Sequence, residues 1–212
     1  MVALEPLDPG AHFAALFEAS HGPAAAAGLW DYMAVGPFEN ESDFAAWAKA
    51  SAALEDPLFF AIVDRESGGP SGMCSYLRFT PEHGVIEIGN IWFSLDLQRT
   101  RQATEAIFLL AGHVFDELGY RRLEWKCDSL NAPSRRAAER LGFTFEGVFR
   151  QHMFVKGRNR DTAWYALLDR DWPIVKRAFE QWLSSPNFDR YGRQRRSLRA
   201  VRDSLTGVAG EG

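Results

Sequence analysis

The segment at positions 97–106, LQRTRQATEA, has the residue types and spacing in this chain that best fit anion binding. It follows the apolar run VIEIGNIWFSL and opens a stretch with helical apolar spacing, so it predicts a turn from a strand into a helix. The first backbone amides of a helix lack partners within the helix and attract phosphate groups. The segment has two arginines and no glycine, which leaves two interpretations: a phosphate cradle, or a charged loop without a ligand.

Several common catalytic motifs are missing from the sequence. There is no CxxC or HExxH spacing for a metal, no GxSxG nucleophile elbow, and no GxGxxG or GxxxxGK[ST] phosphate loop. We therefore expect no metal ion. The serine hydrolase, P-loop and Rossmann classes all lose support.

The bulk composition narrows the class of protein further. The chain has 212 residues, 46% of them apolar, and a net charge of -4, which does not favour nucleic acid or an anionic membrane as a partner. No apolar run approaches the ~20 residues that span a bilayer. Cys74 and Cys127 are too few for a disulfide framework. We expect a cytoplasmic protein with two reduced thiols.

The apolar pattern predicts an α/β (α+β) protein with a mixed, mostly antiparallel sheet and one clear strand–helix–strand crossover. Strands are expected at MVALEPL, PLFFAIVDR, GMCSYLRFT, VIEIGNIWFSL and YRRLEWKCD, and in a hairpin made of FTFEGVFRQHMFVKG and DTAWYALLD joined by KGRNR. Helices are expected within 9–53, over 100–118, at NAPSRRAAERLG and at DWPIVKRAFEQWL. The helix over 100–118 should end at Gly119 and bury one face, formed by Ile107, Ala111, Val114, Phe115 and Leu118.

The character of the chain changes after Leu183. Residues 190–202 contain six arginines. We therefore divide the chain into a domain over 1–183 and an arginine-rich arm over 184–212, whose last residues, TGVAGEG, are expected to fray. The arm fits three interpretations: a solvated tail, an arm for packing or for homodimer formation, or a surface for an acidic partner.

Three segments resemble the GNAT superfamily of N-acetyltransferases: EIG, QRTRQATEA and GYRRLEWKCDSLNAPSRRAAERLGFTFEG. The resemblance is strongest to the branch that includes the ribosomal-protein N-terminal (RimJ/RimL-like) acetyltransferases, and it covers about residues 2–183. The pyrophosphate loop of that family has the pattern Gln/Arg-x-x-Gly-x-Gly/Ala. Gln98 and Ala103 match this pattern, whereas Arg101 replaces the central glycine. The block Asn131-x-x-Ser134, which leads into RLGF, is the more specific match.

The resemblance implies a GNAT fold of about seven strands, with helices on both faces and a splayed central strand pair. It also implies acetyl-CoA as the donor substrate, whose pantetheine arm would pair with the exposed edge of the strand around 91–95. Backbone N–H groups of Trp92 or Phe93 would hold the tetrahedral oxyanion. The implied cofactor-binding residues are Trp92, Phe93, Ser94, Leu95, Gln98, Arg99, Thr100, Arg101, Gln102, Ala103, Thr104, Asn131 and Ser134. We interpret the loop as a phosphate cradle that uses Arg101 where relatives use glycine, with the guanidinium adding a bond to a phosphate oxygen.

Acetyl transfer also needs a proton acceptor and a proton donor, because free amines have a pKa near ~8 for an α-amine and near ~10.4 for lysine. Glu87 is the first candidate base, since it is a lone carboxylate in an apolar strand. A structural glutamate is the alternative, and Glu146 and Asp128 are weaker candidates. Ser134 could protonate the CoA thiolate, or it could be only a helix cap.

In this superfamily the first helices and the last hairpin line the acceptor site. On this chain the implied residues are Trp30, Asp31, Tyr32 and Phe38, with HMFVKGRNRD opposite, although helix packing by the aromatics is an alternative. Aromatic walls suit an aliphatic amine or a peptide N-terminus, and Asp31 would attract an ammonium group. The acceptor, a protein N-terminus or a small-molecule amine, stays open.

Three functions are compatible with these residues. The first is an acetyl-CoA-dependent N-acetyltransferase in which the amine attacks directly within a ternary complex. The second is a non-catalytic acyl-CoA-binding or regulatory module that keeps the fold. The third is a structural subunit that dimerises through the arginine-rich arm.

Overall fold

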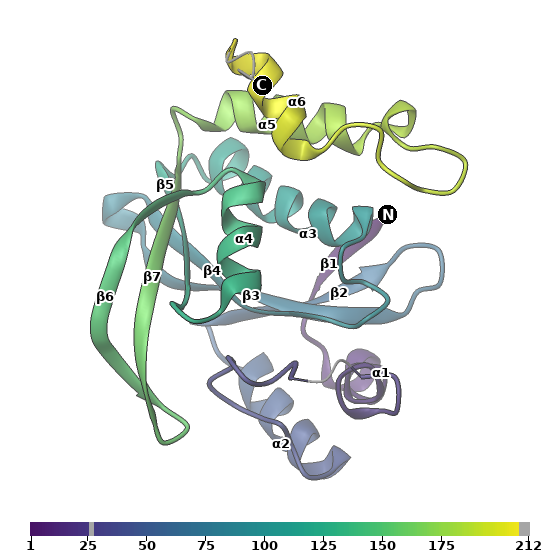
Figure 1. The fold of residues 1–212 in the computed structure, drawn as a ribbon. Helices are drawn as coiled ribbons and strands as arrows, with labels where there is room; N and C mark the ends of the chain where they lie inside the picture. Colours follow the sequence, from purple (N-terminus) through teal and green to yellow (C-terminus); the bar gives the residue numbers. More distant parts are fainter. Residues whose placement is uncertain (26–27, 208–212) are drawn as a thin grey trace.

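A computed structural model of the chain describes residues 1–25 and 28–207, so most of the segment expected to fray, residues 208–212, lies outside the described part. The core of the molecule is a seven-stranded sheet with the order β1-β2-β3-β4-β5-β7-β6 (Figure 1). Only β4 and β5 run parallel, and the other neighbours are antiparallel. The predicted mixed, mostly antiparallel sheet is therefore confirmed. The strands are β1 (Val2–Pro6), β2 (Leu58–Asp64), β3 (Pro70–Thr80), β4 (Val85–Phe93), β5 (Arg122–Asp128), β6 (Thr144–Val155) and β7 (Arg158–Leu168).

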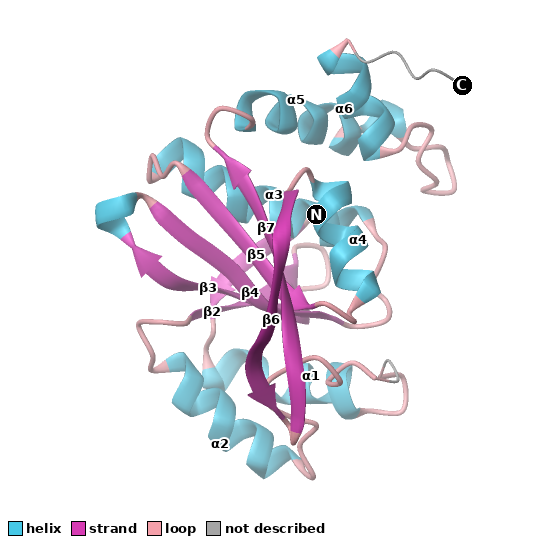
Figure 2. Cartoon of the chain, turned by 60° about the vertical axis from the view of Figure 1, so that its left-hand side comes forward, coloured by secondary structure: helices cyan, strands magenta, loops and turns pink. Residues whose placement is uncertain are grey.

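Helices cover both faces of the sheet, as predicted (Figures 1 and 2). On one face lie α1 (Pro9–His21) and α2 (Glu41–Ala52). On the other face lie α3 (Arg101–Gly112) and α4 (Ala132–Leu141), with α5 (Trp172–Leu183) packed over α3 and α6 (Leu198–Thr206) over α5. None of the helices in the described ranges is long and apolar enough to cross a membrane.

The alternation of side chains along the strands produces two hydrophobic cores. On β2, Phe59, Ala61 and Val63 pack toward α1 and α2, whereas Ile62 packs toward α3. The core on the α3 side of the sheet is the larger of the two, and it continues through α5 into α6. Each large apolar side chain buried in this way contributes roughly 1.5–3 kcal/mol.

Two predicted details are wrong: the length of the last hairpin turn and the burial of Leu118. The turn of the last hairpin is only Lys156–Gly157, with φ of 49° and 75°, rather than the five residues KGRNR. Two consecutive positive φ values are typical of the two-residue turns that match strand twist. The helix over 100–118 changes to a π-helical segment at His113–Glu117, and Leu118 is 44% exposed rather than buried. Gly119 does end this segment, in the left-handed conformation.

The arginine-rich arm is packed against the rest of the chain. Leu198 and Val201 of α6 are buried, and α6 contacts both α4 and α5. Arg202 donates to the backbone carbonyls of Glu139 and Arg140 at the end of α4. The packing interpretation of the arm therefore accounts for its second half, whereas homodimer formation stays a prediction.

Candidate functional site

The parallel strands β4 and β5 separate halfway along their length. Their pairing runs from Val85↔Arg122 to Ile88↔Trp125 and stops there. Beyond that point β5 stays paired with β7 as far as Asp128, whereas β4 stays paired with β3 as far as Phe93. The edge of β4 from 89 to 93 is thus open toward β5, and the expected splay of the central pair is present.

A β-bulge lies at the start of this open edge. The register between β3 and β4 shifts between Met73 and Ser75, and Asn90 takes a φ of 50°. The Asn90 side chain donates to Ser75 Oγ at 2.9 Å, and Ser75 Oγ donates to the Gly89 carbonyl at 3.1 Å. A bulge leaves a backbone group unpaired and re-aims the strand. The sequence analysis missed it, although Gly89-Asn90 inside a strand is a signal for it.

The turn after β4 is closed by its own hydrogen bonds. The carbonyl of Ser94 accepts from the amides of Leu97 and Gln98, and the Gln98 side chain donates to the Phe93 carbonyl at 3.0 Å. Thr100 caps α3, because its Oγ1 accepts from the Ala103 amide at 3.1 Å. The expected strand–turn–helix is therefore present, and Gln98 acts on the turn itself.

The start of α3 retains unpaired backbone donors. Within the described residues, the amides of Arg99, Arg101 and Gln102 have no hydrogen-bond partner, whereas those of Thr100 and Ala103 do. Arg99 takes the left-handed conformation, with a φ of 62°. Arg101 is the first residue of the helix and needs no conformation that only glycine adopts. The backbone of the cradle is therefore intact without glycine.

The side chain of Arg101 is not free to bind a phosphate oxygen, contrary to our prediction. Its guanidinium donates to the Leu183 carbonyl at the end of α5 and lies 5.0 Å from the centre of the Phe188 ring. Arg101 therefore links the cradle to the C-terminal arm rather than standing free for a phosphate oxygen. The sequence could not place the arm, so this partner was not predictable.

Asn131 and Ser134 lie together at the start of α4, across the splay from β4. Asn131 is the N-cap, and its Oδ1 accepts from the Ser134 amide at 3.1 Å. Ser134 is therefore not the cap. Its Oγ accepts at 3.0 Å from Nε1 of Trp125, the last residue of β5 that pairs with β4. Burial raises the pKa of the neighbouring Cys127 thiol, although a hydrogen bond to Ser134 acts in the opposite direction.

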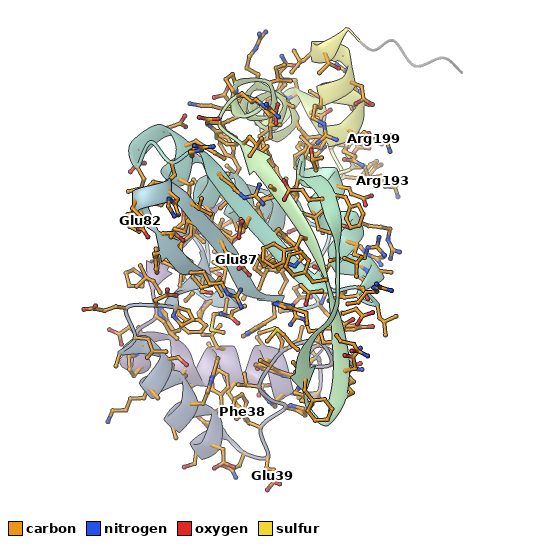
Figure 3. All side chains as sticks on the ribbon, turned by 90° about the vertical axis from the view of Figure 1, so that its left-hand side faces the viewer. Phe38, Glu39, Glu82, Glu87, Arg193 and Arg199 are labelled. Atoms are coloured by element: carbon orange, nitrogen blue, oxygen red, sulfur yellow. The ribbon has the colours of Figure 1, made fainter. Side chains whose placement is uncertain are left out.

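Glu87 is buried as expected, but it is ion-paired. Its Oε2 lies 2.9 Å from Lys126 Nζ and also accepts from Arg78. Lys126 reaches on to Glu124 Oε2 at 2.7 Å, and its ammonium group lies 3.9 Å from the centre of the Trp164 ring. Figure 3 shows Glu87 within the sheet, away from the rim where Glu82 lies. These partners were not predictable from the sequence, because they come from the neighbouring strands β3 and β5.

The two weaker base candidates have other contacts. Glu146 forms two hydrogen bonds with Arg122, which lower the pKa of its carboxyl group. Asp128 is buried and accepts from the Leu130 amide at 2.9 Å, in the turn between β5 and α4. Glu146 is therefore paired with a cation and Asp128 is held by a turn amide, and the choice of Glu87 as the base stays a prediction.

The segment between α1 and α2 is held by the tip of the last hairpin. Lys156 donates to the carbonyl of Trp30 at 2.8 Å, and Arg158 donates to that of Asp31 at 2.6 Å. Tyr32 donates to the Leu130 carbonyl at 3.2 Å, so this segment also reaches the β5–α4 turn. The predicted acceptor walls therefore do lie opposite each other.

The predicted acceptor residues differ in exposure. Asp31 is exposed and Tyr32 is half-buried. Trp30 is buried, and its ring lies 5.5 Å from that of Phe38 and 5.9 Å from that of Trp92. The positions of Trp30 and Phe38 are therefore explained largely by packing of their rings, which was the alternative to a role in acceptor binding. Asp31 and Tyr32 are the members available to a ligand.

A splayed parallel pair, a β4 bulge and a helix that starts at the open end are together the features of an acetyltransferase of the GNAT type, and the chain belongs to this family. The family described as "Acetyltransferase (GNAT) domain" matches residues 2–144. Members of this family use acetyl-CoA as the donor. In the described residues no group of three His, Cys, Asp or Glu is placed to hold a metal ion.

Individual relatives are similar over most of the chain. A GCN5-related N-acetyltransferase from Brucella melitensis is 48% identical, with a TM-score of 0.93 over 95% of this chain and 91% of that one. The "Putative ribosomal N-acetyltransferase YdaF" of Bacillus subtilis is 28% identical over 68% of this chain and 79% of its own length. An uncharacterized N-acetyltransferase, p20, of Bacillus licheniformis is 32% identical over 53% of this chain, and the match spans 63% of that relative. The match to the Bacillus subtilis relative, whose name refers to ribosomal N-acetylation, supports the predicted RimJ/RimL-like branch.

Proposed function

We propose that this chain transfers the acetyl group of acetyl-CoA to a primary amine by direct attack in a ternary complex. One observation carries the proposal: the unpaired amides at the start of α3 lie at the end of the sheet where β4 leaves β5. A molecule with a diphosphate at one end and an extended amide chain at the other fits that arrangement.

The donor would lie along this line. The amides of Arg101 and Gln102 would bind the pyrophosphate, and the pantetheine arm would run along the open edge of β4 toward α4. Asn131 Oδ1 is occupied by the cap, so its amide NH₂ group would meet the pantetheine. The thioester would then lie near Trp92 and Phe93. Because the Ser94 amide donates to the Ser71 carbonyl of β3, alternation along the strand directs the Phe93 N–H to the open edge, and it is the proposed oxyanion donor.

Protons would move through two side chains. Glu87 Oε2 is engaged by both cations, so Oε1 is the atom that would accept the proton of the attacking amine, through a water molecule. Ser134 Oγ accepts from Trp125, which leaves its own proton to donate to the departing CoA thiolate. Each transfer of this kind contributes about 10²–10⁴-fold in rate.

The acceptor would approach from the face opposite α4, between the α1–α2 segment and the last hairpin. Asp31 would attract its ammonium group, and Tyr32 would pack against its aliphatic part. The name of the Bacillus subtilis relative refers to ribosomal N-acetylation, which makes a protein N-terminus the first class of acceptor to examine. A small-molecule amine is the second.

The pairing of Glu87 favours a second candidate function. A carboxylate between Arg78 and Lys126 has a sufficient structural role without catalysis. The chain would then be an acyl-CoA-binding or regulatory module with the same fold. Both candidates predict CoA binding, but only the first predicts turnover.

Two measurements separate these candidates. Thermal shift with acetyl-CoA, CoA and ATP tests binding, because a ligand of the native state raises its stability. Thiol release from acetyl-CoA, over a panel of peptides and amines, tests turnover. Glu87→Gln should lower kcat/KM about a hundredfold or more. Glu82→Gln is the matched control, because Glu82 is exposed (Figure 3). CoA binding without thiol release for any amine would favour the regulatory module.

A further inference from the structure

The segment between α5 and α6 folds into a compact turn that we call the arginine loop, residues 188–196. Phe188 pairs with Gln194 in an isolated β-bridge. Asp189 Oδ1 accepts from the amides of Tyr191 and Arg193, and the Asp189 amide donates to the Arg193 carbonyl at 3.0 Å. The loop is therefore held by its own hydrogen bonds, and its one carboxylate is used in forming it.

The cations of this loop have no anionic partner. Within the part of the chain that the structure describes, no carboxylate lies within 4.0 Å of the guanidinium groups of Arg190, Arg193 or Arg195. The Arg190 and Arg193 groups lie 4.7 Å and 5.9 Å from the centre of the Tyr191 ring, which is 66% exposed. Both guanidinium groups are thus placed beside one exposed ring, which limits the conformations that their side chains lose on binding an anion.

The arginine loop lies beside the phosphate cradle. Figure 1 shows it on the side of the molecule at which α3 begins. Two contacts attach it there: the Arg101 guanidinium lies 5.0 Å from the centre of the Phe188 ring, and Trp182 Nε1 donates to Gln194 Oε1 at 2.8 Å. The first contact involves the first residue of α3, so the loop is held beside the proposed cradle by Arg101.

We propose that the arginine loop is the binding site for the 3′-phosphate of CoA, and this rests on the proposed function. If the pyrophosphate binds at the start of α3, the pantetheine lies between the separated ends of β4 and β5. The nucleotide, on the other side of the pyrophosphate, must then extend in the opposite direction, toward the surface. The 3′-phosphate is a terminal dianion a few bonds from the pyrophosphate. Guanidinium groups bind such phosphates through paired, charge-assisted hydrogen bonds.

This assignment gives the arm a role in donor selection. Arg190 and Arg193 would contact the 3′-phosphate directly, and Arg101 would be a positioning residue that holds Phe188 and hence the loop. The protein should then discriminate between CoA and 3′-dephospho-CoA, which share every other group. A nucleic acid or an acidic protein would be the alternative ligand for the same cations.

The test compares the dissociation constants of CoA and 3′-dephospho-CoA for the full chain, measured by calorimetry at fixed salt. The wild-type protein should bind CoA about tenfold or more tightly than 3′-dephospho-CoA. Arg193→Gln and Arg190→Gln should each weaken CoA about five- to tenfold and leave 3′-dephospho-CoA unchanged. Arg199→Gln is the matched control, because Arg199 lies on α6 near Asp203, at 3.8 Å, and should change neither constant. Figure 3 labels both Arg193 and Arg199.

The outcomes separate the inference from the proposed function. If CoA binds but the two variants leave its preference over 3′-dephospho-CoA unchanged, the arginine loop is not the site. The same holds if the variants lose affinity for an oligouridine probe while CoA binding is unaffected. If neither CoA species binds the wild-type protein, the proposed function fails and the inference fails with it. Because both variants lie on an exposed loop, unchanged thermal midpoints would show that folding is not the cause.

Discussion

Replacing Lys126 with methionine removes the cation that lies between the carboxylates of Glu87 and Glu124. Its Nζ lies 2.9 Å from Glu87 Oε2 and 2.7 Å from Glu124 Oε2, and its side chain is 6% exposed. Loss of one partner from a buried ion pair costs about 3–5 kcal/mol. Each carboxylate retains one arginine, Arg78 or Arg122, so the expected loss is at the lower end, about 3 kcal/mol.

Urea unfolding at pH 7 measures this loss directly, and thermal unfolding should show a midpoint lower by about 6–12 °C for a chain of this length. Lys49→Met is the control, because Lys49 is exposed on α2. That control should stay within about 0.5 kcal/mol of wild type. Both substitutions remove one positive charge and keep an unbranched side chain, so the difference between them measures the buried contacts of Lys126, which are the two ion pairs and the Trp164 ring.

A double-mutant cycle with Glu87→Gln tests the assigned cause. The neutral amide needs no cation, so Lys126→Met should cost at least about 1 kcal/mol less in the Glu87→Gln background. A loss below about 1 kcal/mol in the wild-type background, without coupling, would refute the reasoning. The pairs would then contribute little to stability, and Glu87 would be better explained by catalysis than by structure.

Three further predictions concern single groups. Ser134→Ala should lower kcat at saturating acetyl-CoA by about tenfold or more and leave Trp125 Nε1 without its acceptor; an unchanged kcat would remove the general-acid role. Thr100→Val should cost about 1 kcal/mol in urea unfolding because the Ala103 amide loses its cap, and full stability would mean that the cap contributes nothing. Burial opposes ionisation of Glu124, but its two cationic neighbours outweigh burial and lower its pKa. The contribution of the Glu124 carboxylate to the free energy of unfolding is therefore complete above its ordinary pKa of 4.5 and is lost as pH falls through the lowered pKa. A urea midpoint that stays constant down to pH 3 would contradict this.

The order of elements could be predicted from the sequence, because each strand and helix has its own apolar period. The register of the strands could not. Glu87 appeared to be a lone carboxylate because its partners lie 9 and 39 positions away, on β3 and β5. The pairing Glu87↔Glu124 sets these contacts, since it brings Lys126 diagonally opposite Glu87. A slip of one residue would turn Glu87 to the other face of the sheet.

The candidate site was predictable where its features are local and not where they depend on distant segments. The strand–turn–helix at the cradle and the Asn131 block are each coded by consecutive residues. The tether of the α1–α2 segment by Lys156 and Arg158 joins residues more than a hundred positions apart. Arg101 is the intermediate case. Its backbone followed from the local sequence, but its side chain depends on where α5 ends.

The replacement of glycine by arginine at position 101 now has a physical account. The turn requires one left-handed residue, and that residue is Arg99, at a cost of roughly 1–2 kcal/mol. Position 101 is helical, so an arginine there adds no strain, and its amide and that of Gln102 remain free to bind an anion. The longer side chain instead reaches the Leu183 carbonyl and Phe188, which lie at the start of the arm. The residue that departs from the family pattern is therefore the one that contacts Phe188 at the start of the arginine loop, and this contact is why we propose that the loop and the start of α3 bind one donor together.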